Sequence, residues 1–72
     1  MEILHRVGAL IRHHRLDHGL SQEELGHKAS LHRTYVSSVE RGIRNPTITV
    51  LHRIASALGL TVSELLDGLE EE

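Results

Sequence analysis

Residues 22–41 hold the feature that most constrains the fold, because two short apolar patterns of helical spacing follow each other across a very short break. In the first pattern Leu25 and Ala29 are four residues apart, and in the second Val36 and Val39 are three apart. Each pair therefore lies on one face of a short helix. The residues between the two patterns, 30–32, are too few for a loop with structure of its own. The sequence thus predicts two short helices that meet at a tight turn.

The second of these segments has a polar face opposite its apolar one. Its members are hydrogen-bond donors and acceptors: Arg33, Thr34, Ser37 and Ser38. Two helices joined by so short a turn form the helix-turn-helix pattern, in which the second helix enters the major groove of DNA. Gly26, whose side chain is a hydrogen atom, lets the two helices approach closely. The four polar residues are therefore candidates for reading bases, with Arg33 first because a guanidinium matches two acceptors of guanine.

At these residues the chain resembles the Cro/CI-type (Xre) family of helix-turn-helix transcriptional regulators, and most of all the small controller proteins of restriction–modification systems. The resemblance rests on Leu-His-Arg-Thr-Tyr-Val-Ser at 31–37 and Glu-Arg-Gly-Ile-Arg-Asn at 40–45, and it extends from about Ile11 to Leu66. It implies an all-α, compact five-helix bundle, lambda-repressor-like, with a central helix-turn-helix. The implied function is sequence-specific binding of double-stranded DNA by a homodimer on a pseudo-palindromic operator.

The resemblance also implies roles for residues outside the polar face. Contacts to the DNA phosphates and backbone fall on six positions: Ser21, Gln22, Tyr35, Arg44, Asn45 and Thr47. Spacing alone leaves Tyr35 equally suited to packing beside the turn. Arg15 and Glu40 match positions that form an ion pair between the first helix and the end of the recognition helix. Two positions depart from the pattern: we expect His14 to be partly buried, and Ser30 to adopt a left-handed backbone at some cost or to shift the turn.

Helical spacing, caps and stop signals predict the remaining helices. A first helix over residues 3–18 carries a stripe and ends at Gly19; the stripe consists of Ile3, Val7, Leu10, Ile11 and His14. The next helix begins at a capping box formed by Ser21 and Glu24. Thr47 caps a further helix at about 48–58, for which we expect His52 and Arg53 to be solvated. Its expected inward positions are Ile48, Leu51, Ile54, Ala55 and Leu58.

The C-terminal segment repeats the start signal at 60–65 and predicts a short helix at about 62–67. Its apolar side chains exceed what one short helix can bury against a small bundle: Leu60, Val62, Leu65, Leu66 and Leu69. Such a surplus indicates contact with a partner. The family forms its dimer through C-terminal helices, so the resemblance puts the two-fold axis here. We take residues 1–69 as one DNA-binding domain and 70–72 as an acidic tail, and we expect 68–72 to be frayed.

Composition narrows the class of protein. The chain has 72 residues with no Cys, Phe or Trp and one Tyr, so its small core must consist of Leu, Ile and Val without disulfides. The net charge of −2 is low for a DNA-binding domain, but residues 33–53 hold four Arg and one Glu. No apolar run could span a membrane and no signal peptide is visible, so a cytoplasmic location is expected.

Two alternatives from other classes stay open. His13, His14 and His18 include a pair four residues apart that can chelate a metal, but no third ligand is evident, so no metal or cofactor is predicted. A protein-interaction or antitoxin-like module could use the same fold, although it would need apolar anchors where Arg33 stands. No catalytic set is visible, so no enzyme activity is expected. RNA polymerase as a further partner, the operator sequence and the sign of regulation are left open.

Overall fold

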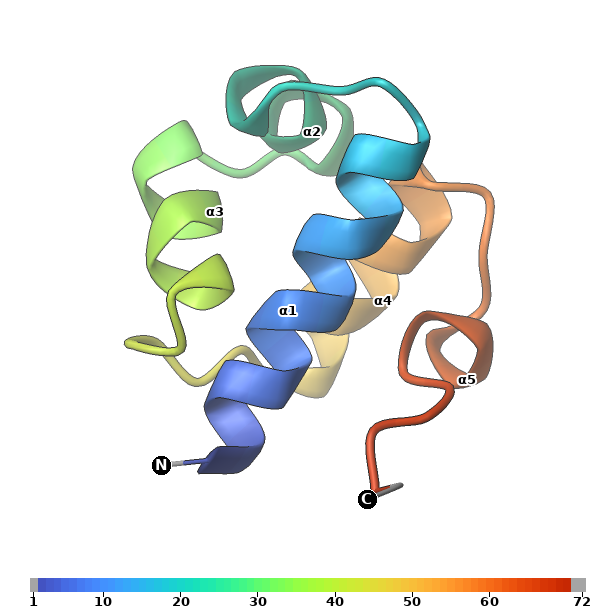
Figure 1. The fold of residues 1–72 in the computed structure, drawn as a ribbon. Coiled ribbons are helices and arrows are strands. Elements are labelled where there is room, and N and C mark those ends of the chain that lie inside the picture. The colour runs from blue at the N-terminus through green and yellow to red at the C-terminus, as the bar shows by residue number, and fades with distance from the viewer. Residues whose placement is uncertain (1, 71–72) are drawn as a thin grey trace.

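The computed structural model describes residues 2–70, and this part of the chain contains five α-helices and no strand. In chain order the helices are α1 Glu2–Asp17, α2 Gln22–Ala29, α3 Arg33–Glu40, α4 Ile48–Ala57 and α5 Val62–Leu65. In Figure 1, α1 lies at the front of the bundle, α2 crosses its C-terminal end, α3 and α5 lie on either side, and α4 lies behind. The predicted all-α, five-helix architecture is confirmed.

The helices begin where the sequence supplies side-chain acceptors for free backbone N–H groups. At the start of α2, α3, α4 and α5 a side chain accepts a hydrogen bond from the first turn; these caps are Ser21, His32, Thr47 and Thr61. The boxes at Ser21 and Thr61 are complete, because Glu24 and Glu64 accept from the backbone of the capping residue. The capping boxes predicted from the sequence are therefore present at the starts of α2 and α5.

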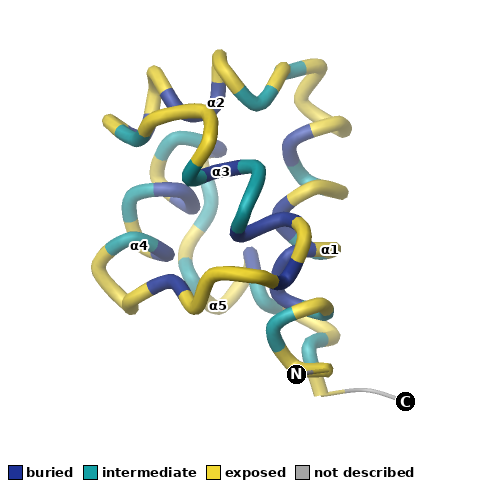
Figure 2. Tube along the Cα trace, turned by 90° about the vertical axis from the view of Figure 1, so that its left-hand side faces the viewer, coloured by how far each residue is buried: buried dark blue, intermediate teal, exposed yellow. Residues whose placement is uncertain are grey.

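The core is aliphatic, as the composition requires. Figure 2 shows the buried segments concentrated on the sides of the helices that face one another. The largest fully buried side chains come from all five helices: Ile11, Leu25, Val36, Val39, Ile54 and Leu65. The apolar faces predicted for the two short helices, α2 and α3, are thus confirmed as core. Because the core fixes one side of α3, its polar side is turned outward.

Two glycines allow backbone segments to approach more closely than any side chain would permit. A Cβ at Gly26 would lie 2.5 Å from the carbonyl oxygen of Leu31, so this glycine makes room for the turn itself. A Cβ at Gly8 would lie 2.4 Å from the carbonyl oxygen of Glu40, where α1 crosses the end of α3. The role of Gly26 was expected from the sequence, whereas that of Gly8 depends on a crossing between distant segments.

Two isoleucines depart from the predicted inward stripes. Ile48 was expected to point inward but is 68% exposed, and Ile3 is 40% exposed. Both lie in the first turn of their helices, where the helical spacing continues but the neighbouring helices, as far as residues 2–70 show, do not cover the side chain. His14 is half-buried, as expected.

The C-terminal region also differs from the prediction. Helix α5 ends at Leu65 instead of residue 67, and Leu65 is fully buried within its own chain. The assignment of Leu65 to a dimer interface was therefore wrong, because no part of its side chain is left for a partner. Residues 68–69 are not frayed, since Nη1 of Arg6 donates to the carbonyl of Leu69 at 2.9 Å. The expectation for residues 71–72 lies outside the described residues.

Within residues 2–70 no helix has the length and apolar character that crossing a membrane requires.

Candidate nucleic-acid interface

The outward face of α3 begins with its two most accessible polar residues. Arg33 and Thr34 in the first turn are exposed, and Ser37 and Ser38 are partly exposed. The hydroxyl of Ser38 donates to the carbonyl of Tyr35 at 2.8 Å, so it is partly engaged by its own helix. The side chains available for contact are therefore concentrated at the N-terminal end of α3, the end that reaches base edges in helix-turn-helix proteins.

Arg33 has only a weak internal partner. Its Nη1 atom lies 3.6 Å from Oε2 of Glu23, and the two side chains are 64% and 74% exposed. An ion pair between such exposed groups contributes about 0–1 kcal/mol. Arg33 can therefore exchange this carboxylate for an acceptor on DNA at little cost.

The turn between α2 and α3 contains a left-handed serine, the first of the two alternatives expected for this position. Ser30 has φ +58° and ψ +44°, and its N–H bonds back to the end of α2. Arg53, which was expected to be solvated, is instead tied to this turn. Its Nε atom donates to the carbonyl of Ala29 at 3.0 Å and its Nη2 atom donates to the carbonyl of Ser30. The prediction for Arg53 was wrong because α4 packs against α2, whose last carbonyls need donors.

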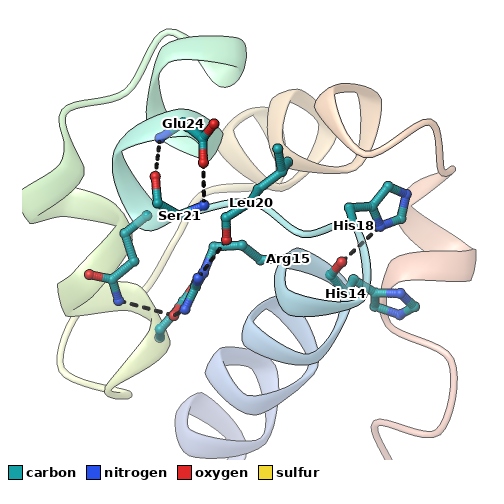
Figure 3. A network of polar contacts seen from close by, with 8 residues as sticks. His14, Arg15, His18, Leu20, Ser21 and Glu24 are labelled. Carbon is teal, nitrogen blue, oxygen red and sulfur yellow. Dashed lines mark hydrogen bonds and ion pairs between the residues drawn. The ribbon is translucent and has the colours of Figure 1, made fainter.

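A buried ion pair joins α1 to the end of α3. Nε of Arg15 lies 2.7 Å from Oε2 of Glu40 and Nη2 lies 3.0 Å from Oε1, with the side chains 7% and 2% exposed. The pair implied by the resemblance is thus present. Nη1 of Arg15 also donates to the carbonyl of Leu20 at 2.8 Å, the contact seen in Figure 3. Arg15 therefore fixes the start of α2 as well as the end of α3.

Gln22 takes part in the same network. Its Nε2 atom donates to Oε1 of Glu40 at 3.1 Å. This bond uses one of the two amide protons that the side chain could offer to a phosphate. Gln22 therefore lies between the N-terminus of α2 and the C-terminal end of α3, a link that its helix position alone does not reveal.

The start of α2 is closed by reciprocal hydrogen bonds between Ser21 and Glu24, drawn in Figure 3. The backbone N–H of Ser21 donates to Oε1 of Glu24 at 2.8 Å, and the N–H of Glu24 donates to Oγ of Ser21 at 3.0 Å. The hydrogen bond from the Ser21 backbone, and after it the bond from the Ser21 side chain, hold the pKa of Glu24 below its ordinary value. These hydrogen bonds therefore favour the charged form of Glu24, the form that accepts from the Ser21 backbone.

The loop after α3 brings Arg44 beside this helix. The N–H groups of Ile43 and Arg44 both donate to the carbonyl of Ser38, at 3.0 and 3.2 Å. The guanidinium carbon of Arg44 lies 5.1 Å from the ring centre of Tyr35, a cation–π contact. Arg44 and Asn45 are exposed, whereas Tyr35 is half-buried. Tyr35 thus packs partly against the core and also supports an exposed cation.

The predicted residues not yet described are Thr47, at the start of α4, and the apolar residues of the C-terminal segment. Thr47 accepts from the N–H of Val50 at 3.1 Å and caps the start of α4, and Thr47 itself is exposed. The C-terminal apolar residues still partly exposed are Leu60, Val62, Leu66 and Leu69. Two of them, Leu66 and Leu69, line a hollow of about 450 Å³ on the surface.

The histidines form no cluster of ligands. His18 Nδ1 donates to the carbonyl of His14 at 2.8 Å, as Figure 3 shows, and the rings of His13 and His14 meet edge to face. Within residues 2–70 no group of three or more His, Asp or Glu side chains is arranged to hold a metal ion.

Comparisons with known proteins agree that the chain is similar to helix-turn-helix regulators. The helix-turn-helix family model matches residues 11–65. The uncharacterised HTH-type transcriptional regulator y4dJ of Sinorhizobium fredii is 38% identical over 71 residues, which is 99% of this chain and 92% of that protein. The control protein C.SmaI of Serratia marcescens is 42% identical over 74 residues, covering 100% of this chain and 88% of its own length.

Among solved structures, the restriction-modification controller protein C.AhdI of Aeromonas hydrophila superposes with a TM-score of 0.88 at 38% identity. The superposition covers 90% of this chain and 98% of C.AhdI.

Proposed function

The chain belongs to the helix-turn-helix family of DNA-binding transcriptional regulators, and from that premise we propose that it binds a pseudo-palindromic duplex site as a homodimer, with α3 in the major groove. The observation that carries the proposal is the division of α3 into two faces. Val36 and Val39 are buried in the core, while Arg33 and Thr34 are exposed at the end of the helix that would meet the bases.

Base reading is assigned to Arg33, supported by Thr34 and Ser37, with Ser38 at the edge of the face. A guanidinium can donate two parallel hydrogen bonds to O6 and N7 of guanine, the most common specific contact in the major groove. The weak pairing with Glu23, at 3.6 Å, leaves the Arg33 guanidinium available for this contact.

Contacts to phosphates are assigned to two helix starts and one loop. Free N–H groups at a helix N-terminus, together with the positive end of the helix dipole, attract anions. The residues concerned are Ser21 and Gln22 at α2, Thr47 at α4, and Tyr35, Arg44 and Asn45 beside the loop. The cation–π contact holds Arg44 next to α3, so one phosphate could be bound at the edge of the same groove.

Dimerisation is assigned to the C-terminal apolar patch, defined as Leu60, Val62, Leu66 and Leu69. These side chains are partly exposed on a domain with a small core, and pairing with a second copy would bury them. A two-fold axis at this patch would present two copies of α3 to successive major grooves about 34–36 Å apart. Residues 1–69 would act as the DNA-binding domain, with 70–72 as an acidic tail.

The similarity to control proteins favours a regulator of restriction–modification genes. In this role the chain would work in the cytoplasm and without catalysis, and RNA polymerase is a further partner that we propose for activation.

Selection of bound sites from random duplexes tests the proposal. We expect a two-fold-symmetric sequence with half-sites about one helical turn apart. With this site, Arg33→Ala should lower affinity by about 1–3 kcal/mol and relax specificity at one base pair of each half-site. An equal loss on scrambled duplex would contradict base reading by Arg33.

Arg44→Ala is the matched comparison, since it removes an exposed arginine outside the base-reading face. We expect it to weaken binding to all sequences together and to reduce the salt dependence of log K by about one unit of slope. An unchanged slope would contradict phosphate contact by Arg44.

A further inference from the structure

His32 begins the recognition helix with a ring nitrogen in place of the usual oxygen cap. The Nδ1 atom of His32 accepts a hydrogen bond from the backbone N–H of Thr34 at 3.1 Å. The same Nδ1 atom lies 2.8 Å from Oγ1 of Thr34. Both residues are exposed, so neither contact arises from packing in the core. Nδ1 of His32 thus contacts both the backbone N–H and the side-chain hydroxyl of Thr34.

The chemistry of these groups determines where the protons are. A backbone N–H can only donate, so Nδ1 of His32 must be the acceptor and carry no proton. The Thr34 hydroxyl, 2.8 Å from this unprotonated nitrogen, can form a hydrogen bond to it only by donating its own proton. The hydroxyl proton is therefore used within the chain. The lone pairs of Oγ1 remain free for an outside partner.

We propose that His32 is a specificity-determining positioning residue, which fixes the Thr34 hydroxyl as a hydrogen-bond acceptor so that α3 selects a base with an exocyclic amino group at one position. The proposal rests on the proposed placement of α3 in the major groove. Adenine N6 and cytosine N4 present such donors there, whereas the major-groove polar atoms of guanine and thymine are acceptors. An unrestrained hydroxyl would rotate to suit either kind of base.

Arg33, the residue before Thr34, has the opposite hydrogen-bonding character. Arg33 offers only donors and suits guanine, and Thr34, held by His32, would offer an acceptor. Two adjacent residues at the exposed end of α3 would then read opposite hydrogen-bond patterns. Since His32 contacts Thr34 and is assigned no contact to a base, its effect on specificity would pass through the Thr34 hydroxyl.

The test measures how each variant responds to removal of one amino group from DNA and to guanine or thymine at the same position. In the selected site, each adenine or cytosine of one half-site is replaced in turn by an analogue lacking the exocyclic amino group, purine for adenine or 2-pyrimidinone for cytosine. Dissociation constants are measured by fluorescence anisotropy for the full chain. For the wild type we expect one position where the analogue weakens binding about fivefold, the effect of losing a single hydrogen bond.

Four variants then assign that response to its residues. Thr34→Val, which keeps the shape but lacks the hydroxyl, should not distinguish the analogue from the natural base. His32→Ala should keep an amino-dependent loss, because a freed hydroxyl can still accept from the amino group. It should lose the wild-type discrimination against duplexes with guanine or thymine at this position, because the freed hydroxyl can donate to their acceptors. His32→Asn supplies a side-chain oxygen as the cap and should restore this discrimination. Arg33→Ala should keep the fivefold ratio and lose selectivity at a different base pair.

The readout is a ratio between two duplexes for one variant, so a general loss of helix stability cancels. A His32→Ala variant that discriminates against guanine and thymine at this position as strongly as the wild type would overturn the inference, as would an absence of any amino-dependent position. In either case a symmetric selected site and a base-specific loss in Arg33→Ala would leave the proposed function standing. Failure of the wild type to select any sequence would overturn the proposed function instead.

Discussion

At the scale of single residues, the pair Arg15 and Glu40 has the largest energetic consequence. Both charges are almost completely removed from water, and their remaining hydrogen-bonding groups are used by Leu20 and Gln22. A buried pair of this kind contributes little compared with an apolar pair of equal size, but the loss of one partner leaves an uncompensated charge. The pair therefore favours one arrangement of α1, α2 and α3 over arrangements that would separate the two buried charges.

Arg15→Met should lower the free energy of unfolding by about 3–5 kcal/mol, because the carboxylate of Glu40 stays buried without its cation. Urea unfolding followed by circular dichroism measures the change. The double variant Arg15→Met with Glu40→Met should recover more than half of the loss, since no charge is then stranded. A double variant no more stable than Arg15→Met alone would contradict this account.

Ser30 carries a backbone strain that a single substitution can remove. Its φ of +58° disfavours any residue with a Cβ, and the left-handed region costs an L-residue about 1–2 kcal/mol. Part of the gain from glycine is lost to the greater freedom of the unfolded chain. Ser30→Gly should therefore raise the free energy of unfolding by about 0.5–1 kcal/mol. Ser30→Ala, which keeps the Cβ, is the matched control with little expected change, and equal stabilisation by both variants would refute the strain.

At the scale of elements, α2 and α3 form a unit that other helices hold in position. The two short helices meet at a turn made possible by Gly26 and Ser30, and α1 fixes the outer ends through Arg15. Helix α4 supports the turn itself, since Arg53 donates to the last carbonyls of α2. Neither short helix would be stable alone at eight residues, so the orientation of α3 depends on these contacts.

Arg53→Met should destabilise the protein by about 1–2 kcal/mol, because the carbonyls of Ala29 and Ser30 lose charged donors near the negative end of the α2 dipole. Thermal melting measures the change, with exposed His52→Ala as the control on the neighbouring position of α4. An Arg53→Met variant as stable as His52→Ala would show that the turn needs no support from α4.

At the scale of the whole molecule, the C-terminal segment has two roles, core packing and the proposed dimer contact, which fall on neighbouring residues. Leu65 closes the core of its own chain, while the partly exposed apolar residues around it form the C-terminal apolar patch that we assign to the dimer. The bond from Arg6 to Leu69 holds this segment against α1. A partner bound here would therefore meet a surface already fixed before association, which lowers the cost of ordering on binding.

Leu66→Lys and Leu65→Ala should separate these purposes. Leu66→Lys puts a charge into the patch and should yield a folded monomer in analytical ultracentrifugation, with weaker binding to the two-fold site. Leu65→Ala opens a core cavity and should cost about 2–5 kcal/mol of stability. Ile48→Lys, at an exposed site outside the patch, should leave the dimer intact. A dimeric Leu66→Lys protein would move the interface elsewhere.

What the sequence determined by itself is local in origin. The caps at Ser21, Thr47 and Thr61, the stop at Gly19 and the two-faced pattern of α3 depend on hydrogen bonds and spacing within a few residues. Such features form wherever the same short segment is helical, so they could be predicted with the family resemblance or without it. The ion pair of Arg15 and Glu40 spans 25 positions and was reached only through the resemblance.

What only the tertiary structure decided depends on segments far apart in the chain. Ile48 and Leu65 have the same apolar character, yet one is exposed and the other closes the core, because helical spacing does not show where neighbouring helices end. Arg53, Gly8 and Gln22 gained their roles from crossings between helices. Their physical reason is the same in each case: a helix fixes the direction of a side chain, and packing alone fixes what that side chain meets.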